Sequence, residues 1–565
     1  MNVVRLVRSS PLRRSRSSVC DNLNRQFAIA YTNGQILSTP ETAIDPAQLP
    51  PMPSQEARFR SEMGQISRHS AVFFLGTLFT AAAGYLFKIY VARILGANAL
   101  GLYALGMTLV GFFGLFNGLG LPQTAVRFVA AYSATAQFQR LHAFFRHALG
   151  LLGVANLLLA GAMLLIGPRL ARSLYHSPDL VRFLPLFAWL LVFGGFAAFL
   201  GQVLAGYKDI VLRTVITNFV GSPLNIILGL ILLAAGMGLR GYVLAQVVSG
   251  AIVLLLLFTA AWKLTPSAAR RFAGQPSKME SEVFWFSAAL FGVNVLEFLL
   301  AQTDKIMLGI FLDVRQVGIY AVAASLVTFV PVALQSVNQI FTSTIADLHA
   351  RGERVLLGRL FQTLTKWIIG LTLPLALVMC VYSKPLMHLF GPAFEAGWIV
   401  LIIGTLGQLI NAGVGPVGYL LLMSGHQRRL VRVQCFMAVF MVVVTVALVR
   451  PFGIIGVAVA AALTNAISNY LYLREVRAVL QFTPYNRGYL RIVFPSIASL
   501  AVVLLFRFLV SVNPQWVSIG AALVVAYITF CGLSLFVGLD NDDRMIATAI
   551  RRKLLGTVRR DPSLS

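Results

Sequence analysis

Long apolar stretches constrain the fold of this chain more than any other feature. Apolar stretches of roughly 18 to 25 residues recur along the chain, and each stretch is long enough for an α-helix to cross the ~30 Å hydrocarbon core of a bilayer. The stretches are continuously apolar rather than alternating, which favours helices over a membrane β-barrel. We therefore predict an all-α polytopic membrane protein with about 14 transmembrane helices. The predicted spans lie near residues 69–92, 99–121, 147–167, 183–205, 214–236, 240–262, 284–312, 317–341, 364–382, 396–422, 431–449, 453–473, 490–511 and 515–537.

The composition agrees with a membrane location. Hydrophobic residues make up 58% of the chain and charged residues only 12%, and the mean hydropathy is +0.79. A soluble protein of 565 residues would need a far more polar surface than this composition provides.

The apolar sequence also repeats itself. Segment 88–104 begins with Lys-Ile and ends with Gly-x-Tyr-Ala, and segment 305–321 keeps the same residues at the same spacing about 217 positions later. A second pair, 238–245 and 453–460, shares a Gly-x-x-Gly pattern at nearly the same offset. Two membrane-embedded halves of similar sequence are typical of transporters whose substrate path lies between the halves.

The distribution of positive charge predicts the orientation. The formal net charge is +26, which by itself would also suit a nucleic-acid-binding protein. With the N-terminus in the cytoplasm, however, the inner loops hold roughly twice as many Lys and Arg residues as the outer loops, as the positive-inside rule requires. We predict a multi-pass protein of the cell (inner or plasma) membrane, with both termini cytoplasmic, contacts with anionic membrane lipids and no nucleic-acid partner.

The two ends of the chain differ in composition from the spans. The first 68 residues are rich in arginine and serine, with a proline-rich stretch at 40–53, and we predict a disordered tail there. An organelle transit peptide and a true start at Met63 are alternatives. The predicted organisation is a basic cytoplasmic tail at 1–68, an N-lobe with spans one to six at 69–262, a cytoplasmic linker at 263–283, a C-lobe with spans seven to twelve at 284–475, spans thirteen and fourteen at 476–540, and a basic cytoplasmic tail at 541–565.

Motifs for catalysis are absent from the sequence. It has no phosphate-binding loop of the Walker type, no zinc-type histidine pair and no nucleophile elbow, and its four cysteines lie far apart. A membrane glycan polymerase or ligase would need a large outer loop, and the longest predicted one, about 168–182, is short. We therefore predict that the chain is not an enzyme, binds no metal and needs no cofactor.

Span seven carries the densest group of polar residues inside a predicted helix. Asn294, Glu297 and Asp304 fall at helical spacing and share one stripe. Two carboxylates in a low-dielectric cleft disfavour each other's ionisation, so we predict that Glu297 and Asp304 couple ion movement to transport. The alternative is that Asp304 and Lys305 lie in solvent at the outer helix end and that only Glu297 is buried.

Lys88 and Lys305 occupy matching positions in the repeat. Pseudo-symmetry would turn both toward the interface between the halves, where two amines suit an anionic substrate such as a pyrophosphate-linked lipid. Arg93 and Arg127 would extend this basic path. The alternative is that Lys88 and Arg93 anchor the protein to lipid headgroups. The predicted central-cavity residues are Lys88, Arg93, Arg127, Asn294 and Lys305.

Several segments resemble a known family. Segment 93–103 resembles the first-loop signature of the polysaccharide-transporter branch of the multidrug/oligosaccharidyl-lipid/polysaccharide (MOP) flippase superfamily, and 303–320 resembles its second-half counterpart. Segments 389–394 and 453–458 are similar to the C-terminal region of that branch. The first span lacks the set of arginines that would assign the chain to the related peptidoglycan-precursor flippases.

The resemblance implies both a fold and a function. It implies two six-helix lobes of the MATE type around a central cationic cavity, two additional C-terminal helices, and alternating access driven by an ion gradient. The implied substrate is polyprenyl-diphosphate-linked oligosaccharide for O-antigen, capsule or exopolysaccharide, with the polysaccharide polymerase machinery as a further partner. Cationic cavity residues carry over to Lys88, Arg93 and Lys305. The alternative function is a cation-coupled small-molecule or multidrug antiporter of the same superfamily.

Overall fold

The structure, a computed structural model, describes residues 55–270, 281–485, 487–509 and 515–537. Within these ranges every regular element is a helix and there is no strand, in agreement with the all-α prediction. Parts of the predicted tails and of the predicted linker lie outside the described residues, namely 1–54 and 541–565 of the tails and 271–280 of the linker. The chain divides into two compact units at Phe73, and of the first unit the structure describes only the helical residues 55–73.

The number of membrane-spanning helices matches the prediction closely. Among the described residues, ten helices are long and apolar enough to cross a membrane, and a bent pair, α12 (Val314–Val327) with the start of α13 (Val332–Ala350), adds an eleventh. Two of the ten, α3 (Gln55–Asn117) and α18 (Gln427–Leu480), are each interrupted by a glycine in a non-helical conformation and therefore supply two segments each. With the shorter α20 (Val493–Leu509), the total is about fourteen.

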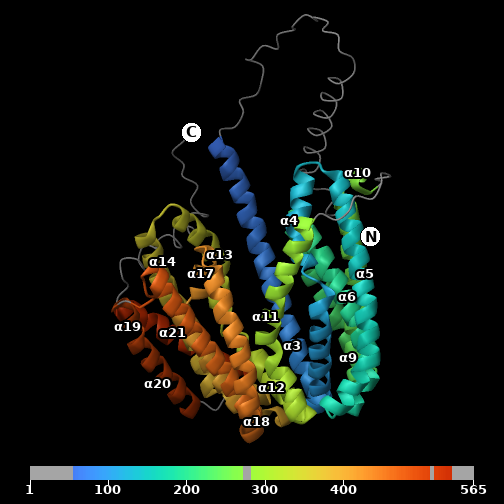
Figure 1. Cartoon of the computed structure of the whole chain (residues 1–565). Helices are drawn as coiled ribbons and strands as arrows, with labels where there is room; N and C mark the ends of the chain where they lie inside the picture. Colours follow the sequence, from blue (N-terminus) through green and yellow to red (C-terminus); the bar gives the residue numbers. More distant parts are fainter. Residues whose placement is uncertain (1–54, 271–280, 486, 510–514, 538–565) are drawn as a thin grey trace, which may run out of the picture. The chain divides into compact units, whose positions relative to one another are not determined.

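The helices of the second unit lie side by side and are joined by short turns (Figure 1). After α3, the first half of the sequence contains α4 (Leu121–Ala134), α5 (Phe138–Arg169), η2 (Leu170–Leu174), η3 (Pro178–Phe183), α6 (Leu184–Gly206), α7 (Ile210–Thr214), η4 (Val215–Gly221), α8 (Ser222–Ala234), α9 (Gly238–Leu264) and α10 (Ser267–Arg270). The second half contains α11 (Ser281–Phe311), α12, α13, α14 (Arg354–Val381), α15 (Ser383–His388), η5 (Pro392–Gly397), α16 (Trp398–Val414), α17 (Val417–Met423) and α18. The chain continues with α19 (Arg487–Leu490), α20 and α21 (Gln515–Val537), of which α20 and α21 pack on each other and on α14.

The repeat seen in the sequence is also a repeat in backbone conformation. Gly238 and Gly453, the first glycines of the two Gly-x-x-Gly patterns, have φ values of 54° and 56°, in the left-handed region that glycine tolerates. Three residues later, a Cβ on Gly241 or Gly456 would lie 3.1 or 2.0 Å from a carbonyl oxygen of the preceding helix. In both halves, the two glycines therefore let the chain reverse tightly and pack back on the helix before it.

Buried side chains show where the two halves are joined. One hydrophobic core includes residues of both halves, among them Leu105, Phe187, Tyr320 and Phe390. All of these lie towards the end of the bundle at which α3 breaks at Gly96, which we call the Gly96 end. Towards the opposite end the core divides into two clusters. One surrounds residues 121–152 and 199–216 of the first half, and the other surrounds 341–361 and 414–421 of the second.

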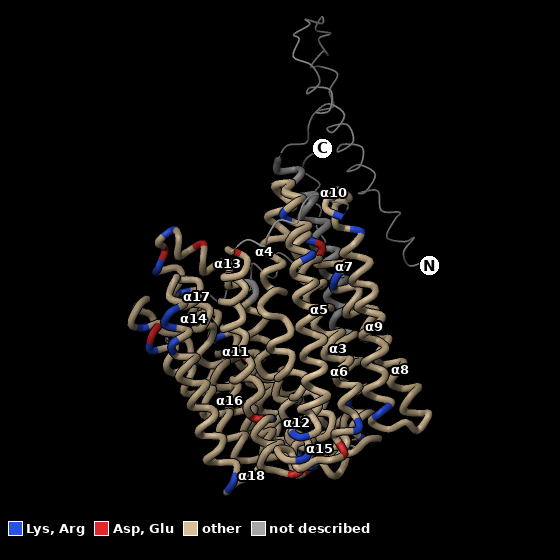
Figure 2. Tube along the Cα trace, turned by 45° about the vertical axis from the view of Figure 1, so that its right-hand side comes forward, with Lys and Arg blue, Asp and Glu red and all other residues tan. Residues whose placement is uncertain are grey.

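Charged residues also lie mainly towards the two ends of the helix bundle. Figure 2 shows most Lys, Arg, Asp and Glu positions towards the two ends of the helices, with few in the middle. This is the pattern expected of helices that cross a hydrocarbon layer, because each charge inside it is costly.

Candidate functional site

A cavity of about 890 Å³ lies between the two halves of the second unit. Its walls are formed by both segments of α3, by Tyr242 of α9, and by α11, α12, α13, α16 and α18 of the second half. The shared hydrophobic core borders the cavity at the Gly96 end, since Leu100, Ala104 and Tyr320 belong to both sets of residues. The cavity therefore has a closed, apolar base at that end.

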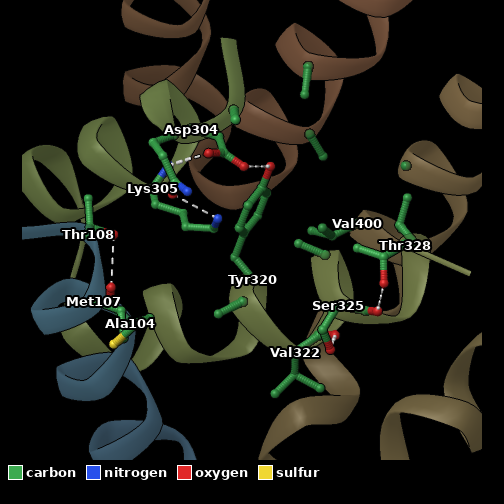
Figure 3. Close-up of a pocket in the computed structure, with 18 of the residues that line it drawn as sticks. Ala104, Met107, Thr108, Asp304, Lys305, Tyr320, Val322, Ser325, Thr328 and Val400 are labelled. Carbon is green, nitrogen blue, oxygen red and sulfur yellow. Dashed lines mark hydrogen bonds between the residues drawn. The ribbon is translucent and has the colours of Figure 1, made fainter. Parts of the chain in front are cut away.

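The cavity contains a group of charged side chains near this base. Lys88 comes from α3, Asp304 and Lys305 from α11, and Tyr320 from α12. The Tyr320 hydroxyl donates to Asp304 Oδ2 at 3.0 Å, and the Lys305 backbone N–H donates to Asp304 Oδ1 at 2.7 Å. Figure 3 shows the Asp304 carboxylate and the Tyr320 hydroxyl pointing toward each other, with the Lys305 side chain beside them.

The two lysine amines are not neutralised by carboxylates. Lys305 Nζ donates instead to the neutral amide oxygen of Gln302, at 2.9 Å. Among the described residues, neither Lys88 nor Lys305 forms an ion pair. The hydrogen bonds to the Asp304 carboxylate come from the Tyr320 hydroxyl and the Lys305 backbone N–H, not from either amine. Two ammonium groups and one carboxylate leave this part of the cavity with a formal charge of +1, so it favours an anionic ligand.

The repeat is not symmetric at the carboxylate. The offset that relates Lys305 to Lys88 also relates Tyr320 to Tyr103, but it relates Asp304 to Phe87. The Tyr103 hydroxyl has no carboxylate at the matching position and donates instead to Gln246 Oε1 at 3.1 Å. Among the described residues that line the cavity, the hydrogen-bonded carboxylate therefore comes from the second half, although both halves supply a lysine.

The walls of the cavity beyond the charged group differ in chemistry. On the first-half side, Ala104, Met107 and Gly111 are apolar or small, and the Thr108 hydroxyl donates to the carbonyl of Ala104 at 2.8 Å. On the second-half side, the lining residues include the polar side chains of Ser325, Thr328, Gln335, Gln408 and Asn465.

A broken helix brings two of these hydroxyls to the cavity. The axes of α12 and the start of α13 meet at 52°, and Pro331, which has no backbone N–H to continue a helix, lies in the break. Just before it, the hydroxyls of Ser325 and Thr328 donate back to carbonyls of their own helix, at 2.7 and 2.6 Å. Such bonds compete with the helical ladder and accompany bends, so the local sequence accounts for the break.

The structure places three of the predicted site residues in the cavity. Lys88, Asp304 and Lys305 line it, as predicted for a path between the halves. The alternative, in which Asp304 lies in solvent and Glu297 is buried, is wrong for this structure, because Glu297 is exposed and does not line the cavity. Asn294 is also outside the lining and accepts a hydrogen bond from Gln123 at 3.4 Å.

The two predicted arginines do not line the cavity, contrary to expectation. Arg93 lies past Lys88 towards the Gly96 end, and its Nε donates to the carbonyl oxygen of Leu389 at 2.7 Å, which ties the first half to the second. Arg127 lies in α4 towards the opposite end. It forms an exposed ion pair with Glu282 at 2.8 Å, and its guanidinium lies 4.7 Å from the ring centre of Phe286.

Several cavity residues were not predicted from the sequence. Tyr320 served only to mark the repeat, and Gln302 was assigned no role. Gln335, Gln408 and Asn465 stand on three different helices and share no spacing that a sequence pattern detects. Only the packing of the helices brings their side chains to one wall.

Comparisons with known proteins agree with this architecture. Residues 66–345 match the model of a family described as polysaccharide biosynthesis protein. The sequence has no match among curated proteins. The lipid II flippase MurJ in an inward closed conformation is 15% identical and superposes with a TM-score of 0.67, covering 82% of this chain and 98% of that one.

Two other similar structures are transporters. An inward-facing multidrug resistance MATE family transporter of the MOP superfamily is 16% identical, with a TM-score of 0.57 over 72% of this chain and 94% of that one. A MOP superfamily transporter from Pyrococcus furiosus, reported to have a binding pocket of reverse polarity, is 15% identical, with a TM-score of 0.51 over 72% and 93%. At these identities the likeness establishes a common fold.

Proposed function

Because the chain belongs to the MOP flippase superfamily, we propose that it moves polyprenyl-diphosphate-linked oligosaccharide across the cytoplasmic membrane for cell-surface polysaccharide synthesis. The observation that carries the proposal is the meeting of Lys88 and Lys305, one from each half, in a cavity with a formal charge of +1. Phosphate oxygens accept charge-assisted hydrogen bonds from ammonium groups, and a diphosphate offers enough oxygens for both lysines.

The position of the lysines suits alternating access. They lie where the two halves meet, so a diphosphate bound by both would hold the halves together on the side of the Gly96 end. With the orientation predicted by the positive-inside rule, that end faces outwards and is closed by the shared core. Movement of one half against the other would open this end and release the headgroup, while the lipid chain stays in the bilayer.

Asp304 is the proposed coupling residue. As a carboxylate it accepts hydrogen bonds from Tyr320 and from the Lys305 backbone, and it lies in the same group as the two lysines. A proton or sodium ion bound at this carboxylate would change the formal charge of the cavity by one and so change its affinity for an anion. Ion binding and substrate binding would thereby be linked through one residue. Glu297, which lies outside the cavity lining, has no such connection.

A multidrug or small-molecule antiporter is the second candidate, because a MATE family multidrug transporter shares the fold. Such a protein would bind a cationic substrate and would need an excess of carboxylates in the cavity. Among the described lining residues Asp304 is the one carboxylate, beside two lysines. The charge of the cavity therefore favours the flippase.

The test is export of surface glycan in a strain that lacks this gene and has no redundant flippase. We expect complete, unpolymerised oligosaccharide-lipid to accumulate on the cytoplasmic side, and the intact gene to reverse this. The Lys88→Ala and Lys305→Ala variants should be inserted in the membrane but restore little export, whereas the control Lys263→Ala, an exposed lysine outside the cavity, should restore it fully. Normal glycan with no accumulated lipid would contradict the proposal and favour the antiporter.

A further inference from the structure

Besides Gln302, which bonds to Lys305, three side-chain amides line the second-half side of the cavity. Gln335 belongs to α13, Gln408 to α16 and Asn465 to the second segment of α18, and all are in the second half. The facing first-half wall, including Met107 and Gly111, carries no amide group. The amides therefore form a polar strip on one side only, which we call the amide wall.

The amide wall is held in place by the packing of α16 on α18. Gly407 lies so close to α18 that a Cβ built on it would be 3.0 Å from the backbone of Ala462. Across this contact, Asn465 Nδ2 donates to the Gly407 carbonyl at 3.1 Å, and the Asn465 side-chain oxygen accepts from Asn469 at 2.9 Å. Gln408 follows Gly407 directly, so the two amides are fixed on neighbouring helices.

Hydrogen-bonding capacity remains free on this wall. The side-chain oxygen of Gln408 accepts from Asn411 at 3.2 Å, which leaves its NH₂ group to point elsewhere. Gln335 is an exposed residue that lines the cavity, and its side-chain amide makes no hydrogen bond among the described residues. Each free amide offers both donors and acceptors without a charge.

The amide wall lies further from the Gly96 end than the lysines do. Lys305 is six residues from the end of α11, or about 9 Å along the helix axis. Gln408 is ten residues into α16, or about 15 Å from its start. A ligand whose diphosphate contacts the lysines would therefore present its next group to the amides.

We propose that the amide wall of Gln335, Gln408 and Asn465 binds the hydroxyl groups of the sugar attached to the diphosphate. Neutral groups with mixed donors and acceptors match hydroxyls. A second phosphate would call for more lysine or arginine, and a cation would call for carboxylates. The inference rests on the proposed function, because the lysines must hold the diphosphate for the sugar to reach the wall.

Equilibrium binding to the full-length protein in lipid nanodiscs tests this inference. The probes are farnesyl diphosphate and farnesyl diphosphate carrying glucose, galactose or N-acetylglucosamine. We expect at least one glycosylated probe to bind the wild type more tightly than the bare diphosphate. We expect the double variant with Gln335→Ala and Gln408→Ala to raise the dissociation constant of that probe about tenfold. The dissociation constant of the bare diphosphate should stay within about twofold of the wild-type value.

Two controls separate the possible outcomes. Gln123→Ala removes an amide that lies outside the cavity and should change neither affinity, while Lys305→Ala should weaken both probes. Gln335→Ala alone breaks no hydrogen bond within the described residues, so its effect does not depend on a folding defect. Equal binding of all probes, or amide variants that leave the glycosylated probe unchanged, overturns the sugar site while the flippase proposal stands. Absence of binding by every probe overturns both.

Discussion

The carbonyl oxygen of Val314 lies against Gly101, so close that a Cβ on this glycine would be 1.8 Å from it. The same contact exists a second time with the halves exchanged, because a Cβ on Gly318 would lie 2.1 Å from the carbonyl oxygen of Ala97. Gly101 and Gly318 are related by the repeat, and so are Ala97 and Val314. At the Gly96 end the halves thus meet backbone to backbone through a pseudo-twofold pair of contacts.

The glycines at the Gly96 end serve two different purposes. Gly96, with φ at 74°, has a conformation that demands glycine. Gly101 and Gly318 have helical conformations. These positions require glycine because another helix approaches too closely to leave room for a Cβ.

Gly101→Ala or Gly318→Ala should force the halves apart at the Gly96 end. The methyl group would overlap a backbone carbonyl, which cannot move as a flexible side chain can. We expect labelling of a cysteine introduced at Met107, which lines the cavity, to become several times faster from that side. A membrane-impermeant maleimide on oriented membranes measures this rate. Gly84→Ala is the matched control, since a Cβ there meets nothing within 4 Å, and equal rates in all variants would refute the closing role of the pair.

Asp304→Asn should separate transport from the ion gradient. The substitution keeps the size of the side chain but removes the charge at which a cation would bind. We expect glycan-lipid transport in proteoliposomes to lose its response to an imposed proton or sodium gradient. Tyr320→Phe removes a hydrogen bond to a charged group, worth about 1.5–3 kcal/mol, and should have a smaller effect in the same direction.

The matched control is Tyr103→Phe. Tyr103 is the repeat-related residue, and its hydroxyl bonds to the neutral Gln246. If this variant alters the gradient response as strongly as Tyr320→Phe does, the effect does not pass through the carboxylate.

Arg127→Gln should leave diphosphate binding nearly unchanged. Its guanidinium pairs with Glu282 in a bridge with side chains 53% and 61% exposed, a type worth at most about 1 kcal/mol. We expect the dissociation constant of farnesyl diphosphate to stay within about twofold, whereas Lys88→Ala should raise it about tenfold or more. Titration of both variants in nanodiscs measures these dissociation constants. A large loss of affinity in Arg127→Gln would show that Arg127 contributes to substrate binding after all.

Gly456→Ala should destabilise the second half. A Cβ there would lie 2.0 Å from the carbonyl oxygen of Leu448, and overpacking of this kind costs about 1–3 kcal/mol. Thermal unfolding of the purified protein should show a lower midpoint. Gly150→Ala, where a Cβ meets nothing within 4 Å, should not lower it, and equal midpoints in the two variants would show that the close contact is easily relieved.

The general architecture follows from the sequence because it depends on local properties. Hydropathy over roughly 20 residues decides whether a segment crosses a membrane, and this identified about fourteen spans. The repeat paired Lys88 with Lys305 without any knowledge of contacts, since similar sequences adopt similar positions in the two halves. For the same reason, it placed both lysines at the interface where the cavity lies.

The remaining features depend on how each helix is rotated against its neighbours. Arg93 and Lys88 belong to one helix, yet Arg93 reaches Leu389 of the other half while Lys88 faces the cavity. Nothing in the spacing of Asp304 and Tyr320 predicts their hydrogen bond, because they lie on helices of different direction. The sequence by itself determined the spans, the two halves and the paired lysines. Only the tertiary structure decided which polar groups meet, because such contacts depend on packing between distant segments that local patterns do not encode.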